Sequence, residues 1–301
     1  MQRRQIQDLA AAALLALATT ALVDAQDTTA KANALVGRLR QALGGDAKLS
    51  SVKGLSFEAD MRRVLPGEGT EAGPEMSGQV QFDISDPKHY LSIDSFSPMP
   101  GMPPISIGSA IDGDSQWSGP ISAPGGPNIM IRAGGGDPSQ LRARLEKDLT
   151  RLSIALLAGN GLPGVEFSYG GQAEAPEGKA EVLIVKGPGD FNGKLFLEEK
   201  TARPLMLVYQ DVPRRMQMRR AGPGEAPPAG GHGGGGAIAP TGPPPQELKE
   251  AQMFLSDYKT EGGVSFPRSV VIKIQDGQTE EWTVSKIKVN PAFGADHFKK
   301  R

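Results

Sequence analysis

Few residues of this sequence have the types and spacing that catalysis or metal binding requires. The three histidines are His89, His232 and His297, and no two of them have the spacing of metal ligands. Ser115 follows Asp114, but this stretch is not a nucleophile elbow and has no local histidine partner. We therefore expect solvated or structural histidines, no catalytic residues and no metal site.

Three other kinds of stretch could indicate a functional site: an oxygen-rich loop, a glycine run and adjacent carboxylates. None of them forms a complete calcium-binding, phosphate-binding or catalytic motif. Residues 112–115, Asp-Gly-Asp-Ser, are incomplete as a calcium loop and are typical of a hairpin turn. The glycine run at 233–236 has neither the lysine nor the strand–helix context of a phosphate loop. Adjacent carboxylates on a strand point to opposite sides. We interpret the pairs Glu198-Glu199 and Glu280-Glu281 as surface charge.

Methionines occur in two close pairs, Met99 with Met102 and Met216 with Met218. Thioether clusters can bind Cu(I) in exported proteins, which is one interpretation. Methionine is also a flexible filler of apolar surfaces. Together with Phe and Leu it suits a surface that accepts acyl chains, and we expect no cofactor.

The composition excludes several classes of protein. The 301 residues carry 33 Lys+Arg against 34 Asp+Glu, so no basic field favours nucleic acid. The absence of cysteine excludes disulfides, cysteine nucleophiles and a lipid-modified N-terminal cysteine. The 39 glycines and 25 prolines indicate many turns and at least one disordered stretch.

The first 25 residues have the pattern of a secretory signal peptide. Arg3 and Arg4 precede an apolar run from Leu9 to Val23, and Ala25 ends a stretch of small residues at the cleavage spacing. We expect general secretion and cleavage after Ala25, with an uncleaved anchor or twin-arginine export as the alternatives. Residues 26–301 are then the mature protein, soluble in the periplasm.

Two amphipathic helices are predicted among many strands. The first covers residues 28–43 and ends at Gly44-Gly45. The second begins after an N-cap at Asp137, carries a leucine stripe from Leu141 to Leu156, and ends at Gly159. Its opposite face is expected to be solvated through Arg142, Arg144, Lys147 and Arg151.

The stretch LFLEEKTARPLMLVY, residues 195–209, predicts a hairpin that is apolar on both faces. Leu205, Leu207 and Tyr209 are expected on one face, and Met206 and Val208 on the other. One face can join an ordinary core. The second must meet a covering helix, a ligand or a partner.

Residues 221–245 are rich in Gly and Pro and cannot bury enough apolar area to offset their ordering entropy. The chain beyond them holds about three strands and no helix, too little for an independent core. We therefore interpret 221–245 as a disordered insertion between strands of a single domain, residues 26–301. Two helices among antiparallel strands predict an α+β fold.

In order along the chain, these features resemble the LolA-like family of periplasmic lipoprotein carriers. The matching stretches are ALVGRLRQAL, LSFEADMRRV, MSGQVQFDISDPKHYLSID, AIDGDSQWSGP, GKLFLEEKTARPLMLVY and the ending from FLSDYKTEGG to FGADHFK. The resemblance implies an incomplete, half-open antiparallel β-barrel covered by helices, with an apolar cavity for acyl chains. One departure is Asp86, which stands where the best-known carriers have a lid arginine.

The resemblance implies an exported carrier of lipoprotein or lipid acyl chains, with an inner-membrane exporter and an outer-membrane acceptor as partners. A non-catalytic envelope sensor or assembly scaffold that binds a protein partner is the alternative, and a hydrolase is the third. The residues expected to line the cavity are Phe57, Met61, Phe82, Leu91, Ile93, Trp117, Leu195, Leu197, Leu205 and Leu207. Each of these residues could instead be ordinary core.

Overall fold

The structure, a computed structural model, describes residues 25–66, 73–97, 103–121, 138–175, 178–211, 248–275 and 277–300. Its strands form one twelve-stranded antiparallel sheet in the order β5-β4-β3-β2-β1-β12-β11-β10-β9-β8-β7-β6. The strands are β1 Leu55–Val64, β2 Glu75–Asp86, β3 His89–Phe96, β4 Ile105–Asp112, β5 Ser115–Ile121, β6 Glu166–Ala175, β7 Gly178–Gly187, β8 Phe191–Glu198, β9 Pro204–Asp211, β10 Lys249–Glu261, β11 Val264–Ile274 and β12 Thr279–Val289.

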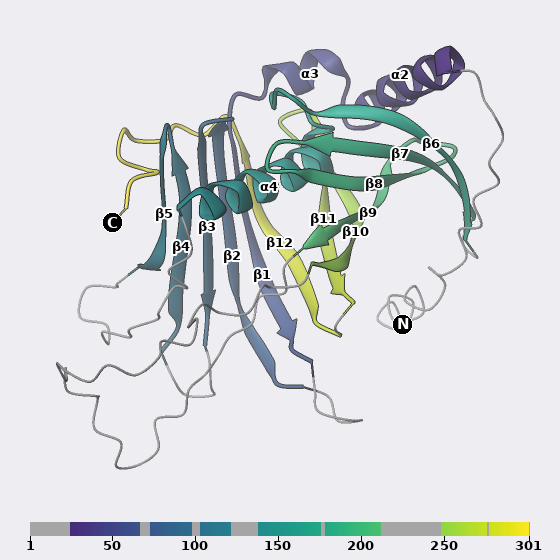
Figure 1. Cartoon of the computed structure of the whole chain (residues 1–301). Helices are drawn as coiled ribbons and strands as arrows, with labels where there is room; N and C mark the ends of the chain where they lie inside the picture. The colour runs from purple at the N-terminus through teal and green to yellow at the C-terminus, as the bar shows by residue number, and fades with distance from the viewer. Residues whose placement is uncertain are drawn as a thin grey trace, which may run out of the picture.

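The sheet consists of two halves that meet at the β1–β12 pair. The chain begins in the middle with β1, moves outward to β5, crosses through a helix to β6 at the far edge, and returns to β12. β1 and β12 are in register from Leu55 opposite Val289 to Val64 opposite Thr279. The sheet is strongly curved and its edge strands are β5 and β6, so it is an open structure and not a closed barrel (Figure 1).

Three helices accompany the sheet: α2 Ala25–Ala42, α3 Asp46–Ser51 and α4 Pro138–Leu157. α4 lies across the inner face of the sheet (Figure 1), and α2 buries Leu35 and Leu39 in the same core. α4 ends where Gly159 takes a positive φ of 71° and its N–H donates to the carbonyl of Ser153 at 3.0 Å. Both predicted helices are confirmed, while the six-residue α3 was not predicted.

The buried apolar residues form two clusters on opposite sides of the sheet. The large cluster fills the inner face, beneath α4 and α2. The small cluster lies on the outer face of β3–β5, where the C-terminal segment 290–300 covers it with Phe293 and Phe298. Trp117 binds this segment to β5, because its Nε1 donates a hydrogen bond to the carbonyl of Phe298 at 2.8 Å.

The predicted α+β class and half-open antiparallel architecture are confirmed. β9 and β10 are antiparallel neighbours in the same sheet, with residues 212–248 between them in sequence. Several predictions lie outside the described residues: residues 1–24 of the signal peptide, the Asp137 cap, a strand at 212–218, Met99, Met102, Met216, Met218, His232 and the segment 221–245.

Candidate ligand-binding face

The inner face of the N-terminal half-sheet is built by strict alternation along β1. Phe57, Ala59 and Met61 are buried there, and the polar residues between them face outward. The ring of Phe57 lies 6.0 Å from that of Phe82 on β2 and 6.3 Å from that of Trp282 on β12. These rings give the inner face a continuous aromatic surface where the two halves of the sheet meet.

The C-terminal half-sheet supplies aliphatic side chains to the same face. Leu195 and Leu197 on β8 and Leu207 on β9 are fully buried in the large cluster. Six of the ten predicted lining residues therefore lie together on the inner face: Phe57, Met61, Phe82, Leu195, Leu197 and Leu207.

The other four predicted lining residues lie elsewhere, which corrects the expected set. Leu91 and Ile93 alternate with the inward residues of β3, so they point outward and join Trp117 in the small cluster. Leu205 is 40% exposed because β9 has a bulge. The pairing passes from Leu197 opposite Pro204 to Phe196 opposite Met206 and skips Leu205.

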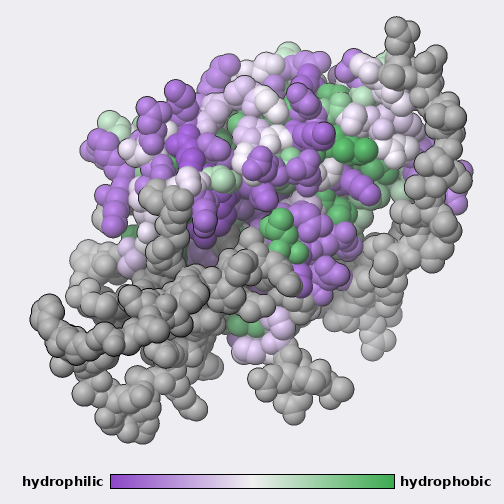
Figure 2. Space-filling view, viewed as in Figure 1, coloured by the Kyte–Doolittle hydropathy of each residue, from purple (hydrophilic) through white to green (hydrophobic). Residues whose placement is uncertain are grey.

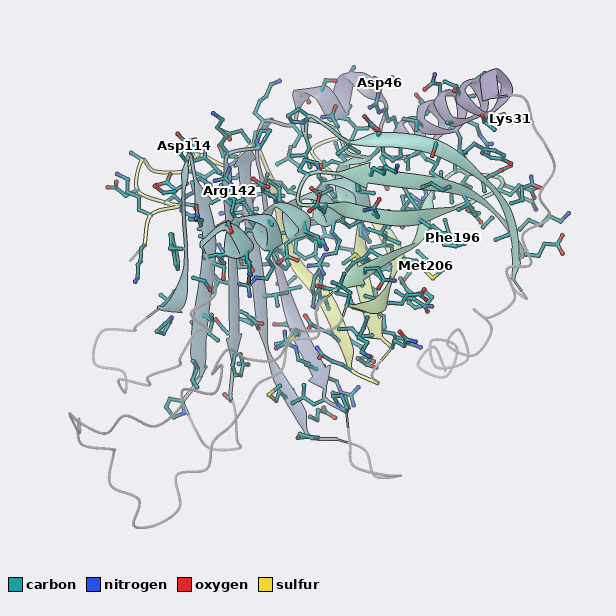
Figure 3. The ribbon with its side chains drawn as sticks, in the orientation of Figure 1. Lys31, Asp46, Asp114, Arg142, Phe196 and Met206 are labelled. Atoms are coloured by element: carbon teal, nitrogen blue, oxygen red, sulfur yellow. The ribbon has the colours of Figure 1, made fainter. Side chains whose placement is uncertain are left out.

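The helix α4 closes the inner face and is attached to both halves of the sheet by polar contacts. Near its start, Arg142 donates from Nη1 to the carbonyl of Gly113 in the β4–β5 turn at 2.9 Å. Farther along, the hydroxyl of Thr150 shares its hydrogen between the carbonyl of Glu146 in α4, at 2.7 Å, and the carbonyl of Pro188, after β7, at 3.1 Å. Figure 3 places Arg142 on α4 at the side of β5, close to the labelled Asp114.

Arg151 was expected on the solvated side of α4, and the structure shows that this is wrong. It is almost fully buried and donates to the phenol oxygen of Tyr209 on β9 at 2.8 Å. Asp148 and Asp211 lie 3.3 and 3.6 Å from its guanidinium. Burial disfavours the charged form, but these neighbours favour it, and the pKa of Arg151 stays well above its usual value. Burial also raises the pKa of Tyr209 to about 12.

A second buried ionic group lies on the inner face near the end of β1. Arg63 is fully buried and its guanidinium lies 2.7 Å from Glu280 on β12 and 2.9 Å from Asp94 on β3. Trp282 donates from Nε1 to the other oxygen of Glu280 at 2.6 Å. Glu280 is therefore not surface charge as predicted. Arg63 continues the inward alternation of β1, and this pattern could have identified it.

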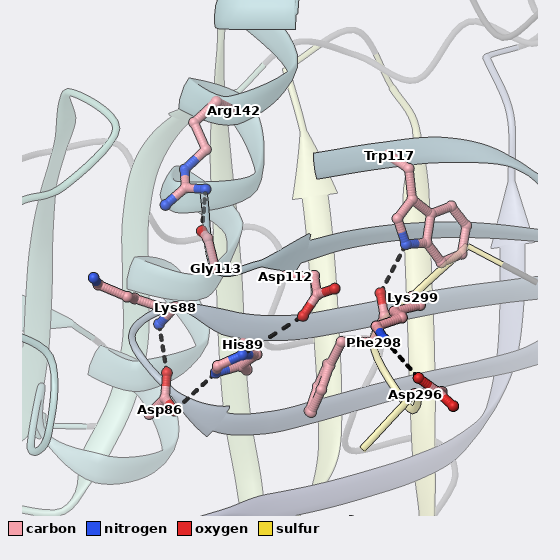
Figure 4. A network of polar contacts seen from close by, with 10 residues as sticks. All are labelled: Asp86, Lys88, His89, Asp112, Gly113, Trp117, Arg142, Asp296, Phe298 and Lys299. Carbon is pink, nitrogen blue, oxygen red and sulfur yellow. Dashed lines mark hydrogen bonds and ion pairs between the residues drawn. The ribbon is translucent and has the colours of Figure 1, made fainter. Parts of the chain in front are cut away.

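Asp86, the residue at the expected lid-arginine position, stabilises the β2–β3 turn. Its carboxylate accepts hydrogen bonds from the backbone N–H of Lys88 at 2.7 Å and from Nδ1 of His89 at 2.8 Å (Figure 4). His297 is similarly held, with its Nε2 2.8 Å from the buried carboxylate of Asp83. Both of these histidines have structural partners.

The described residues contain no cluster of three or more His, Cys, Asp or Glu side chains that could hold a metal ion. A hollow of about 90 Å³ lies on the outer face near Glu58, Gln79 and Gln81. It is polar and well below the roughly 300–1,000 Å³ of a small-molecule site. The apolar inner face is therefore the candidate binding surface, and it is filled by the protein's own side chains.

None of the helices in the described part of the chain is both long and apolar enough to cross a membrane.

Comparison with known proteins gives similarity at the level of structure. Neither the family models nor the curated proteins match the sequence. A LolA superfamily protein from Nitrosomonas europaea is similar over 89% of this chain and 97% of its own, with 10% identity and a TM-score of 0.47. A putative outer membrane lipoprotein-sorting domain from Vibrio parahaemolyticus is similar over 90% and 97%, with 12% identity and a TM-score of 0.45.

A more distant similarity is to the MucA/MucB complex of Pseudomonas aeruginosa, with 13% identity over 87% of this chain, 100% coverage of that chain and a TM-score of 0.23. These solved structures are what the chain is similar to in structure, at 10–13% identity. No residue role or ligand is transferred at these levels of similarity.

Proposed function

We propose that this protein is an exported, non-catalytic carrier that binds acyl chains of lipids or lipoproteins on the inner face, with α4 as a movable cover. The observation that supports this proposal is a continuous apolar face that the long helix α4 crosses and α2 covers in part. The helix is attached to the sheet through side-chain contacts and not through a β-ladder. Such a cover can be displaced without breaking the sheet.

The free energy gained when the stripe leucines of α4 pack on the inner face is of the same order as that gained when an acyl chain binds there. Burial of about 14 methylenes contributes roughly 11 kcal/mol at about 0.8 kcal/mol each. The leucine stripe of α4 buries Leu145, Leu149, Leu152 and Leu156, each worth about 1.5–3 kcal/mol. A bound acyl chain would offset the burial of these four leucines, while Ile154 and Leu157, which are also buried, and the polar contacts of α4 favour the closed state.

The two tryptophans of the chain allow a direct test, because Trp282 lies on the inner face and Trp117 on the outer face. The variant Trp117→Phe retains only the inner reporter, and Trp282→Phe retains only the outer one. Each delipidated variant is titrated with a brominated fatty acid, which quenches tryptophan on contact. We expect saturable quenching of Trp282 and little quenching of Trp117.

The test also defines how the proposal fails. The absence of saturable quenching in both variants, while the unfolding midpoint is normal, would exclude an acyl carrier. Equal quenching of both tryptophans would indicate nonspecific adsorption.

A second candidate function is that of a sensor or scaffold that binds a protein partner. It is favoured by the outer face of the β8–β9 hairpin, where Phe196, Met206 and Val208 are half-buried and belong to neither core cluster.

A further inference from the structure

A row of apolar residues crosses the outer face of five strands at right angles to their direction. The register places each member directly opposite the next, so all five side chains project from the same face. We call this row the outer stripe, and it consists of Val182 on β7, Phe196 on β8, Met206 on β9, Phe254 on β10 and Val271 on β11.

Val182, at one end of the outer stripe, is buried, whereas the other four members are only half-buried by the described residues. None of its five residues belongs to either core cluster or packs against one. Ile184, next to the stripe, is 37% exposed. Phe196 and Met206 lie close together in Figure 3, and hydrophobic residues gather over the same region, around β7–β9, in Figure 2.

Basic side chains line one side of the outer stripe. Lys194 is paired with Val208 and Ile184, and Lys273 is paired with Gln252, so both belong to the adjacent row. Neither forms an ion pair with the described residues, and the ammonium of Lys273 lies 5.6 Å from the ring centre of Phe254. The opposite side carries Glu198 on β8 and the hydroxyl residues Ser256 and Ser269.

The dimensions of the outer stripe match a short helix. Five strands spaced about 4.8 Å apart give a row about 19 Å long, which corresponds to about 13 residues of α-helix. The stripe runs across the strands and not along an edge, so an added β-strand cannot follow it, whereas the apolar face of an amphipathic helix can.

We propose that the outer stripe is the docking surface for an amphipathic helix of a partner protein, with acidic residues along the edge that faces Lys194 and Lys273. This role is independent of acyl binding on the inner face, which lies on the other side of the sheet.

The test uses two synthetic helical peptides of about 13 residues. Both carry the same leucine face, and one edge is lined with Glu in the first peptide and with Lys in the second. We expect the full-length protein to bind the acidic-edge peptide roughly threefold to tenfold more tightly, as measured by fluorescence anisotropy. The double variant Lys194→Glu/Lys273→Glu should reverse this preference.

A matched control changes the same amount of charge elsewhere. Lys88→Glu/Lys288→Glu alters two exposed lysines outside the outer stripe and should keep the original preference. Phe254→Thr preserves β-propensity and should weaken binding of both peptides without changing the unfolding midpoint.

Equal affinity for the two peptides, no binding of either, or no effect of Phe254→Thr would overturn the proposal. It would also be overturned if phosphatidylglycerol vesicles bind in a manner that depends on Phe254 while the peptides do not. Self-association abolished by Phe254→Thr would instead assign the outer stripe to a second copy of the chain. These readouts do not use acyl probes, so a failed acyl test leaves them interpretable.

Discussion

A disulfide between α4 and β7 would test whether the helix is the cover of the inner face. A side chain built at Gly187 places its Cβ 3.8 Å from the Cβ of Thr150 on α4, which is the usual Cβ–Cβ separation of a disulfide, about 3.8 Å. The close contact of 2.6 Å to Thr150 Cγ2 disappears when Thr150 becomes cysteine. The chain has no cysteine of its own, so in the variant Thr150→Cys/Gly187→Cys no other disulfide can form within one chain.

The expected stabilisation follows from the size of the closed loop. A loop of about 38 residues reduces the entropy of the unfolded chain by an amount worth about 4 kcal/mol. Loss of the Thr150 hydroxyl bond to Pro188 costs about 1 kcal/mol. We expect the oxidised variant to be about 4 kcal/mol more stable than the same protein in reductant, and about 3 kcal/mol more stable than the wild type, measured by urea unfolding.

The functional readout uses the same sample in two redox states. If α4 must move to admit an acyl chain, the oxidised variant should show no quenching of Trp282 by brominated fatty acid, and reduction should restore it. The single variants Thr150→Cys and Gly187→Cys control for the substitutions. Unchanged acyl uptake by the stabilised, oxidised protein would refute the movable-cover mechanism, and failure to oxidise would refute the predicted geometry.

Three further outcomes are expected from the polar contacts. Arg63→Met leaves Glu280 and Asp94 buried without their cation and should destabilise the protein by about 3–5 kcal/mol in urea unfolding, whereas Arg62→Met, at an exposed neighbour, should cost much less. Arg142→Ala removes the contact of α4 with Gly113 and should speed acyl uptake in stopped-flow quenching; an unchanged rate would show that this contact does not hold the cover. Burial raises the pKa of Tyr209 to about 12, so its stabilising contribution is complete below about pH 10 and is lost as the pH rises toward 12. Wild-type protein should therefore lose roughly 2–3 kcal/mol more than Tyr209→Phe over that range in alkaline unfolding experiments, and equal losses would contradict the buried phenol.

Local pattern in the sequence was sufficient to predict the two long helices and the class of fold, but not the short helix α3. The alternation along β1 and the leucine stripe of α4 each indicate which residues are buried. Side chains point in the same direction every two residues in a strand and every 3.6 residues in a helix. The hairpin at 195–209 and the turn at Asp86 were also correctly predicted from residue type. These features depend on contacts between residues close in sequence.

The tertiary structure decided which side of the sheet each strand presents to the core and which distant groups meet. Leu91 is more apolar than Tyr90, yet the packing of β3 against its neighbours turns Tyr90 inward and Leu91 outward. Arg63 and Glu280 are 217 residues apart, and their pairing depends on β12 returning to lie beside β1. The bulge at Leu205 aligns Phe196 with Met206 and so completes the outer stripe. Strand register and long-range pairing depend on the whole sheet, and no local stretch of sequence contains that information.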